Sequence, residues 1–245
     1  MAMPRHPLAA AFPGCIQIAG VHDLAEARLV AAAGVHAVGF PLRLAVHAED
    51  LSEPEAAQVA AALRGTPPHA VPVCITYLDA PGAVIALCRD LGMDAVQLHG
   101  DVAEANLRAL RRLAPDIFVI KSLVVRPDNE AVLAATVAAS APHVDAFITD
   151  TFDPATGASG ATGKTHDWTV SARLVAMSPR PVILAGGLTP ANVRRAIAAV
   201  RPAGVDAHTG VEGTDGRKDA GLVAAFVAEA RAGFAALAHP RPPRR

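Results

Sequence analysis

The feature that most constrains this chain is an alternation of short apolar segments with longer amphipathic ones, repeated along its 245 residues. Each short segment is followed by a loop and then by a stretch rich in Ala, Leu and Arg. Continuous apolar strands of this length are expected where helices cover both faces of a parallel sheet. The predicted strands are Ile16–Ala19, Ala37–Phe40, Val71–Ile75, Ala95–Leu98, Phe118–Lys121, Ala146–Thr149, Val182–Ala185 and Val205–Ala207.

The segments between these strands carry helical signals. Asp23–Ala33 has an apolar stripe with a period of 3.6 residues and begins with an N-capping aspartate. Pro190–Val200 has a similar stripe, with Thr189 as its cap and Pro190 at the first helical position. The glycines that we expect to end helices just before the next strand are Gly34, Gly92 and Gly204.

Eight strand–helix units in a chain of this length predict an α/β fold, a single-domain (β/α)8 TIM barrel. A doubly wound open sheet of eight strands fits the same periodicity. The turn after the first strand, Ile18–Asp23, lacks the Gly-x-Gly-x-x-Gly of dinucleotide-binding sheets. We therefore expect a barrel over residues 1–239, followed by a disordered Pro/Arg-rich tail over 240–245.

Composition narrows the range of partners. Lys and Arg number 22 against 23 Asp and Glu, a net charge of -1, so neither nucleic acid nor an anionic membrane is an expected partner. A hydrophobic content of 52% excludes a disordered chain. The three widely spaced cysteines, Cys15, Cys74 and Cys88, fit neither a disulfide framework nor a cysteine-based zinc site. With no signal peptide and no apolar run of 18 residues, the expectation is a cytoplasmic protein.

Polar residues at the predicted strand ends are the candidates for chemistry, because barrel active sites are built there. Arg43 and His47 follow the second strand, His99 the fourth, Asp150 the sixth and His208 the eighth. Two turns after the seventh and eighth strands contain glycines, whose backbone N–H groups can approach an anion closely. The residues expected to hold a phosphate there are Gly186, Gly187, Thr209 and Gly210, although the glycines would serve equally to turn the chain.

Several motifs in register resemble phosphoribosylanthranilate isomerase. They are Val96-Gln97-Leu98-His99-Gly100, Asp150-Thr151 with Gly160–Thr165 and Asp167-Trp168, Leu184–Val193, and Thr209-Gly210-Val211-Glu212 followed by Gly216-x-Lys218-Asp219. The resemblance implies a (β/α)8 barrel and a small phosphorylated ribosylamine substrate, with no metal and no organic cofactor. The family reaction is the Amadori rearrangement of N-(5-phosphoribosyl)anthranilate, in tryptophan biosynthesis.

That reaction needs a general acid to open the ribose ring and a general base to remove the C2 proton. The resemblance assigns the acid to Asp150. The residues that we expect to bind the substrate are Gly186, Gly187, Thr209, Gly210, Arg43, His99 and Gly163. The family base is a cysteine in a Lys-x-Cys-Gly signature, which here reads Gln17-Ile18-Ala19-Gly20. Alanine cannot accept a proton, so His208 and His47 are the candidate replacement bases.

A second departure follows the second strand. The family carries an arginine there that faces the anthranilate end of the substrate, and this chain has Glu49 or Asp50 at that position, with Arg43 nearby. His208 stands where a small hydroxyl residue is common in the family. An oxygen/nitrogen metal site from His47, Glu49, Asp50 and His208 is conceivable, but their spacing matches no standard ligand motif, and we predict no metal site.

Three functions remain open from the sequence. The first is the family's isomerisation with a histidine in place of the missing base. The second is a divergent barrel isomerase or lyase that acts on another phosphorylated sugar or sugar-amine. The third is a non-catalytic paralogue that binds a phospholigand. The assembly is expected to be a monomer or a homodimer.

Overall fold

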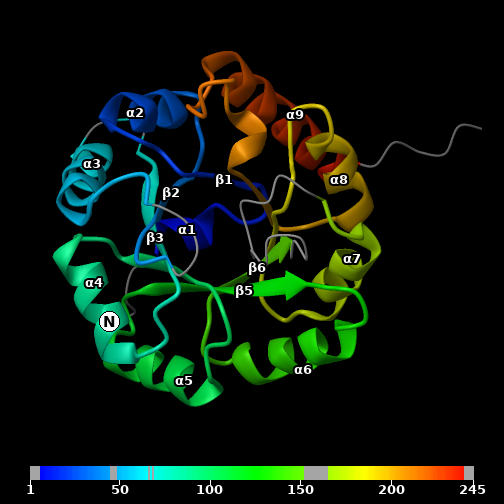
Figure 1. The fold of residues 1–245 in the computed structure, drawn as a ribbon. Coiled ribbons are helices and arrows are strands. Elements are labelled where there is room, and N and C mark those ends of the chain that lie inside the picture. The colour runs from blue at the N-terminus through cyan, green and yellow to red at the C-terminus, as the bar shows by residue number, and fades with distance from the viewer. Residues whose placement is uncertain (1–5, 45–48, 66, 68, 152–164, 240–245) are drawn as a thin grey trace, which may run out of the picture.

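The computed structural model describes residues 6–44, 49–65, 67, 69–151 and 165–239. Its strands run parallel in sequence order and close into a barrel, with β8 hydrogen-bonded to β1. Figure 1 shows the strands at the centre and the helices around them. The predicted (β/α)8 barrel is confirmed, and the closed ladder excludes the open doubly wound sheet.

The strands lie where the apolar segments predict them, with small differences at their ends. The longest is β5, which continues beyond Lys121 to Val125. The strands are β1 Cys15–Ala19, β2 Ala37–Pro41, β3 Val71–Thr76, β4 Ala95–Leu98, β5 Phe118–Val125, β6 Ala146–Thr151, β7 Val182–Leu184 and β8 Gly204–Ala207.

The described helices cover the outside of this barrel, except for α1. Asp23 caps α2 as predicted, since its side chain accepts a hydrogen bond from the backbone N–H of Glu26 at 2.9 Å. The helices are α1 Pro7–Ala10, α2 Leu24–Ala32, α3 Glu53–Gly65, α4 Pro81–Asp90, α5 Glu104–Leu113, α6 Glu130–Ser140, α7 Trp168–Met177, α8 Val193–Val200 and α9 Ala220–Ala238, with a 3-10 turn, η1, at Thr209–Val211.

The predicted start of α8 at Pro190 is wrong. The helix begins at Val193, because the Asn192 side chain accepts a hydrogen bond from the Thr189 N–H at 2.8 Å and holds the preceding residues in a turn. Its predicted stop is also wrong. Arg201, at φ 55°, takes the left-handed conformation that ends the helix, and Gly204 is the first residue of β8.

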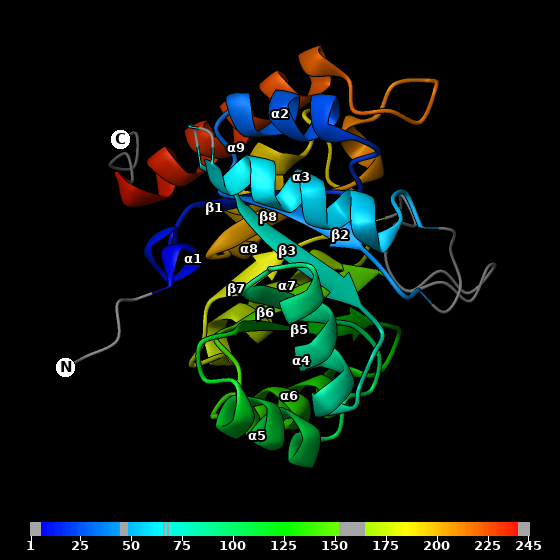
Figure 2. The ribbon, with the colours of Figure 1, turned by 90° about the vertical axis from the view of Figure 1, so that its left-hand side faces the viewer.

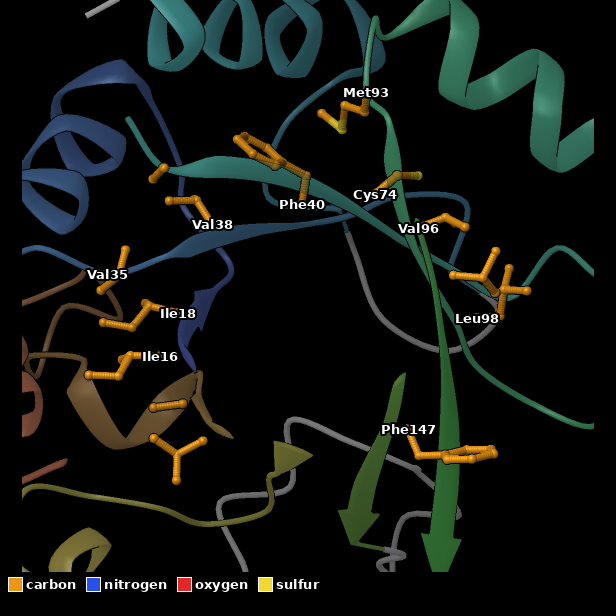
Figure 3. Close-up of a cluster of buried hydrophobic side chains, with 14 of the residues drawn as sticks. Ile16, Ile18, Val35, Val38, Phe40, Cys74, Met93, Val96, Leu98 and Phe147 are labelled. Carbon is orange, nitrogen blue, oxygen red and sulfur yellow. The ribbon is translucent and has the colours of Figure 1, made fainter. Parts of the chain in front are cut away.

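Two apolar layers stabilise the barrel. The outer layer fills the space between strands and helices, where Figure 3 shows Ile16, Ile18, Val38 and Phe40 among the buried side chains. Burying such residues is the main favourable term in folding, at roughly 1.5–3 kcal/mol for each fully buried side chain. Alternate residues along the strands point the other way and make the inner cluster, which fills the barrel itself.

Helix α1 belongs to this inner layer and was not foreseen from the sequence. Leu8 is buried in the inner cluster, and the Phe12 ring stacks on Phe118 with 6.5 Å between centroids. In Figures 1 and 2, α1 lies across the end of the barrel where the strands begin. The opposite end, where the strands finish, is the one left for chemistry.

Within the described residues, α9 is long and apolar enough to cross a membrane by length and composition alone. Its side chains at a helical spacing, Val223, Phe226, Val227 and Ala230, are buried. It also packs closely on α8, because a Cβ on Gly233 would lie 2.9 Å from the Ile197 side chain. These contacts make α9 the last helix of the barrel's outer layer.

Candidate active site

The carboxyl ends of β1, β6 and β8 bring three positions to one end of the barrel. Ile18 pairs with Ala207 in the β1–β8 ladder, so Ala19 and His208 are the next neighbours along these strands. Asp150 lies near the end of β6 and is buried. The candidate acid and one candidate base therefore stand at the same mouth, together with the alanine that replaces the family cysteine.

Asp150 has the properties of a group that can give up a proton near neutral pH. Burial raises the pKa of its carboxyl to about 7, and the nearby Asp206 carboxyl also raises it. The backbone N–H of Thr151 donates to Asp150 Oδ1 at 2.8 Å and partly opposes these effects. A carboxyl that is still substantially protonated at pH 7 is suited to general-acid catalysis.

His99, the residue directly after β4, lies beside Asp150. Its Nδ1 lies 3.4 Å from Asp150 Oδ2, and its Nε2 lies 2.8 Å from Gln97 Nε2. Burial, helped by the Lys121 charge, lowers the pKa of His99 to about 4, so the ring is neutral at pH 7. Its predicted substrate-binding role stays a prediction, and its visible contacts are with the acid and the barrel interior.

Asp206 is a buried carboxyl that was not predicted as a site residue from the sequence, because it lies within β8, two residues before His208, and not at the strand end. Burial raises the pKa of Asp206 to about 7, while a hydrogen bond with the Gln17 side chain and the charge of Lys218 oppose the rise. The signal in the sequence was an aspartate between Val205 and Ala207 in an otherwise apolar strand.

His208 stands over the backbone that follows Ala19. A Cβ on Gly20 would lie 2.6 Å from Cε1 of His208 and 2.7 Å from Cδ2, so the imidazole covers this glycine. His208 Nε2 is 3.5 Å from Glu212 Oε1, which also accepts a hydrogen bond from Lys218 Nζ at 2.5 Å. A carboxylate beside the ring would stabilise the imidazolium that forms if His208 takes a proton.

The turns after β7 and β8 pack against each other. A Cβ on Gly210 would overlap the carbonyl oxygen of Leu188 and lie 2.9 Å from its carbonyl carbon. Gly186 and Gly187 have φ values of 97° and 60°, which side-chain-bearing residues rarely adopt, and Asn192 Nδ2 donates to the Gly187 carbonyl at 2.9 Å. Close packing and glycine backbones are the conditions under which these turns can present N–H groups to one phosphate.

A half-buried histidine, His166, lies beside the turn after β7 and was not predicted as a site residue from the sequence. His166 Nδ1 is 2.8 Å from Thr151 Oγ1, and its Nε2 is 2.6 Å from Ser171 Oγ. Burial lowers the pKa of His166 to about 4. Because a Cβ on Gly186 would overlap Thr151 Oγ1, this hydrogen-bonded chain supports the turn after β7.

The remaining predicted residues lie at the rim or outside the described part of the chain. Arg43 is at the rim, where its guanidinium pairs with Glu53 at 2.7 Å and its backbone N–H donates to Glu49. His47 and Gly163 fall outside the described residues. Asp50 lies 3.6 Å from His22, and the described His, Cys, Asp and Glu residues form no group of three that could hold a metal ion.

Sequence comparison shows which known proteins this chain is similar to. The family model for N-(5'-phosphoribosyl)anthranilate (PRA) isomerase matches residues 22–229. N-(5'-phosphoribosyl)anthranilate isomerase 2 of Methanosarcina mazei is 37% identical over 223 residues, covering 89% of this chain and 95% of that protein. The isomerase of Haloferax volcanii is 39% identical over 217 residues, covering 88% of this chain and 92% of its own length.

Solved structures of phosphoribosyl anthranilate isomerases are also similar to this chain. Phosphoribosyl anthranilate isomerase from Thermotoga maritima superimposes with a TM-score of 0.74 and 29% identity, covering 89% of this chain and 98% of that one. A phosphoribosyl anthranilate isomerase in complex with reduced 1-(o-carboxyphenylamino)-1-deoxyribulose 5-phosphate gives a TM-score of 0.72 with 26% identity and the same coverage.

Proposed function

This chain belongs to the N-(5'-phosphoribosyl)anthranilate isomerase family, and from that premise we propose that Asp150 and His208 are its acid and base. The family reaction is an intramolecular isomerisation, an Amadori rearrangement in tryptophan biosynthesis. The observation that carries the assignment is the place of His208, an imidazole beside Ala19 at the mouth that also holds Asp150.

In the first step, Asp150 protonates the ribose ring oxygen as the ring opens to an iminium. Its raised pKa supports this role, because a carboxyl protonated near pH 7 has a proton to give. His208 then removes the C2 proton to give the enolamine, which rearranges to the ribulose product. Glu212 stabilises the resulting imidazolium from 3.5 Å. His47 is the other candidate base and lies in a segment outside the described residues.

The phosphate of the substrate binds between the turns of Gly186–Gly187 and Thr209–Gly210. The close packing of Gly210 on Leu188 supports this position, since it brings the two backbone turns together. His99 and Arg43 complete the substrate contacts in this proposal, with Gly163. We propose no metal and no organic cofactor, because each chemical step is a proton transfer that side chains can perform.

Turnover of N-(5-phosphoribosyl)anthranilate by the purified protein, followed by loss of anthranilate fluorescence, tests the proposal. Asp150→Asn and His208→Gln should each lower kcat by about 10²–10⁴-fold, the usual contribution of a positioned acid or base. Their melting temperatures should stay close to that of the unmodified protein. Normal turnover by His208→Gln would remove His208 from the mechanism.

One observation favours a second candidate, a related phosphoribosylamine that lacks the anthranilate carboxylate. Glu49 and Glu53 both contact Arg43 at the rim after β2, and Asp50 follows Glu49 in the chain and lies 3.6 Å from His22. An acidic rim disfavours a carboxylate. If this candidate is correct, N-(5-phosphoribosyl)aniline should have a higher kcat/KM than the anthranilate compound; a preference for anthranilate rejects it.

The proposal also covers the cellular location, the oligomeric state and the partners of the protein. We propose a cytoplasmic enzyme that acts as a monomer or a homodimer, without nucleic-acid or membrane partners. A net charge of -1 supports the absence of polyanionic partners. Light scattering during gel filtration, at several protein concentrations, tests the oligomeric state.

A further inference from the structure

Three polar side chains are buried inside the barrel below its mouth. Gln17 on β1, Gln97 on β4 and Asp206 on β8 point inward and are buried at 0%, 3% and 9% exposure. The positions beside them on adjacent strands include Ala37 and Ile120. Burying polar groups in such an apolar interior costs free energy unless they hydrogen-bond to one another. The donor and the acceptor of each bond therefore show how these side chains are oriented.

The hydrogen bonds run in one direction from Gln17 to His99. Gln17 Nε2 donates to Gln97 Oε1 at 2.8 Å. The other end of the Gln97 amide, Nε2, is 2.8 Å from His99 Nε2. Since an amide nitrogen only donates, His99 Nε2 must accept, and the ring hydrogen is left on Nδ1. That Nδ1 is the atom 3.4 Å from Asp150 Oδ2.

We infer that Gln17 is a positioning residue for Asp150, acting through the orientation of the Gln97 amide and the tautomer of His99. If Gln97 turned over, its Nε2 would oppose Gln17 Nε2, donor against donor, and its Oε1 would oppose the bare His99 Nε2. With its own amide held by the hydrogen bond to Asp206, Gln17 keeps Gln97 in the one orientation that leaves the ring hydrogen of His99 on Nδ1, 3.4 Å from Asp150 Oδ2. The inference rests on the proposed role of Asp150 as the acid.

The glutamine that stands at position 17 in place of the family lysine is consistent with this positioning role. The family lysine at position 17 and the glutamine found here can both donate to Gln97 Oε1, and both can face Asp206. A side chain that cannot donate would leave the Gln97 amide without the contact that sets its direction. Lysine is therefore a rescuing substitution, and methionine, of similar length, is the disrupting one.

The direct test is NMR of the protein labelled with ¹⁵N-histidine, because the two ring nitrogens have distinct shifts in each neutral tautomer. The His99 signals are assigned by their loss in His99→Asn. The unmodified protein and Gln17→Lys should show His99 with its hydrogen on Nδ1 alone. Gln17→Met should show exchange between both tautomers. Gln97→Met, which breaks the chain one link closer to His99, is the positive control and should do the same.

A kinetic readout follows from the same geometry. The titratable groups facing Asp150 and His99 are Asp206, Tyr77 and Lys121. A ring hydrogen on Nδ1, the atom 3.4 Å from Asp150 Oδ2, favours the carboxylate, so moving that hydrogen to Nε2 should raise the pKa of Asp150. In Gln17→Met, the basic limb of the kcat profile should move to higher pH, and KM should change by less than twofold. A purely structural role for Gln17 would change activity equally at every pH.

The outcomes are separable from those of the proposed function. A single Nδ1–H tautomer in Gln17→Met overturns the inference, as does a Gln17→Lys protein that behaves like Gln17→Met. If Gln17→Met does not fold, Gln17→Leu is used under the same criteria, and Gln97→Met with an unchanged His99 tautomer also overturns it. Since the NMR readout needs no substrate, it holds even if Asp150 proves not to be the acid.

Discussion

The His208 ring covers Gly20, at the turn directly after the alanine that replaces the family cysteine. A Cβ on Gly20 would lie 2.6 Å from Cε1 and 2.7 Å from Cδ2 of His208. The β1–β8 ladder fixes this relationship, because Ile18 pairs with Ala207, the last residue of β8, and β1 ends at Ala19, directly before Gly20. The position of the imidazole therefore depends on glycine at residue 20.

Gly20→Ala should displace the His208 ring and lower kcat/KM at least tenfold, about 1.4 kcal/mol. Gly34→Ala is the matched control: the two glycines have φ values of 75° and 84°, so both substitutions strain a left-handed residue by roughly 1–2 kcal/mol. At Gly34 the new Cβ meets only the end of the flexible Arg231 side chain. Steady-state kinetics together with chemical unfolding would separate a loss of activity from a loss of stability in the two variants. Equal losses of activity in Gly20→Ala and Gly34→Ala would contradict the assignment of His208 as the base.

Restoring the family cysteine should compensate for loss of His208. We expect His208→Asn to lower kcat by about 10²–10⁴-fold, and Ala19→Cys in that background to recover part of it. Ala19→Ser is the control, because it adds a group of similar size whose hydroxyl is a far weaker base than a thiolate. If serine and cysteine give the same rate in the His208→Asn background, position 19 does not reach the C2 proton.

The phosphate cradle makes a different prediction, in KM. Gly210→Ala places a Cβ on the Leu188 carbonyl, so the turns after β7 and β8 must separate. KM for the phosphorylated substrate should rise at least tenfold, about 1.4 kcal/mol, with a smaller change in kcat. Gly213→Ala, two residues after η1, has one close contact, with the end of the Asp215 side chain at 3.0 Å, and its other contacts lie at 3.8 Å or more, so it should change KM little. Equal affinity for phosphorylated and dephosphorylated ligands would reject the cradle.

The barrel itself could be predicted from the sequence because its cause is local. A strand covered on both faces must be apolar throughout, and eight such strands separated by helical stripes leave few architectures. The predicted start of α8 was wrong because a side chain there hydrogen-bonds to the backbone and competes with helix formation. Asn192 ties the Thr189 N–H into a turn and delays α8, an effect that a proline-based start signal does not include.

The residues of the site also fall into those that the sequence could predict and those that it could not. Asp150 and His208 could be placed at the barrel mouth from sequence, since both follow apolar strands. The contact of Gln17 with Gln97 could not, because these residues are 80 positions apart and meet only through the stagger of the closed barrel. Asp206 was missed because it precedes the strand end, although a lone aspartate in an apolar strand already signals an unusual burial.

The buried carboxyl of Asp206 predicts how stability depends on pH. Burial raises its pKa to about 7, so between the unfolded value near 4 and about pH 7 the folded state holds a proton that the unfolded chain has lost. Stability from this group is therefore full at low pH and is lost as pH rises to 7. Asp206→Asn stays neutral throughout and escapes this loss.

Urea unfolding of Asp206→Asn and the unmodified protein at pH 4.5 and pH 8 measures the effect. The variant should gain a few kcal/mol relative to the unmodified protein between the two pH values. His99 and His166 act oppositely, because burial lowers their pKa values to about 4 and stability falls as pH drops from 6.5 towards 4. Removing Asp206 should therefore expose a steeper rise of stability with pH, whereas Asp79→Asn, an exposed control, should leave the profile unchanged. A parallel pH profile for Asp206→Asn and the unmodified protein would mean that Asp206 is ionised in the folded barrel.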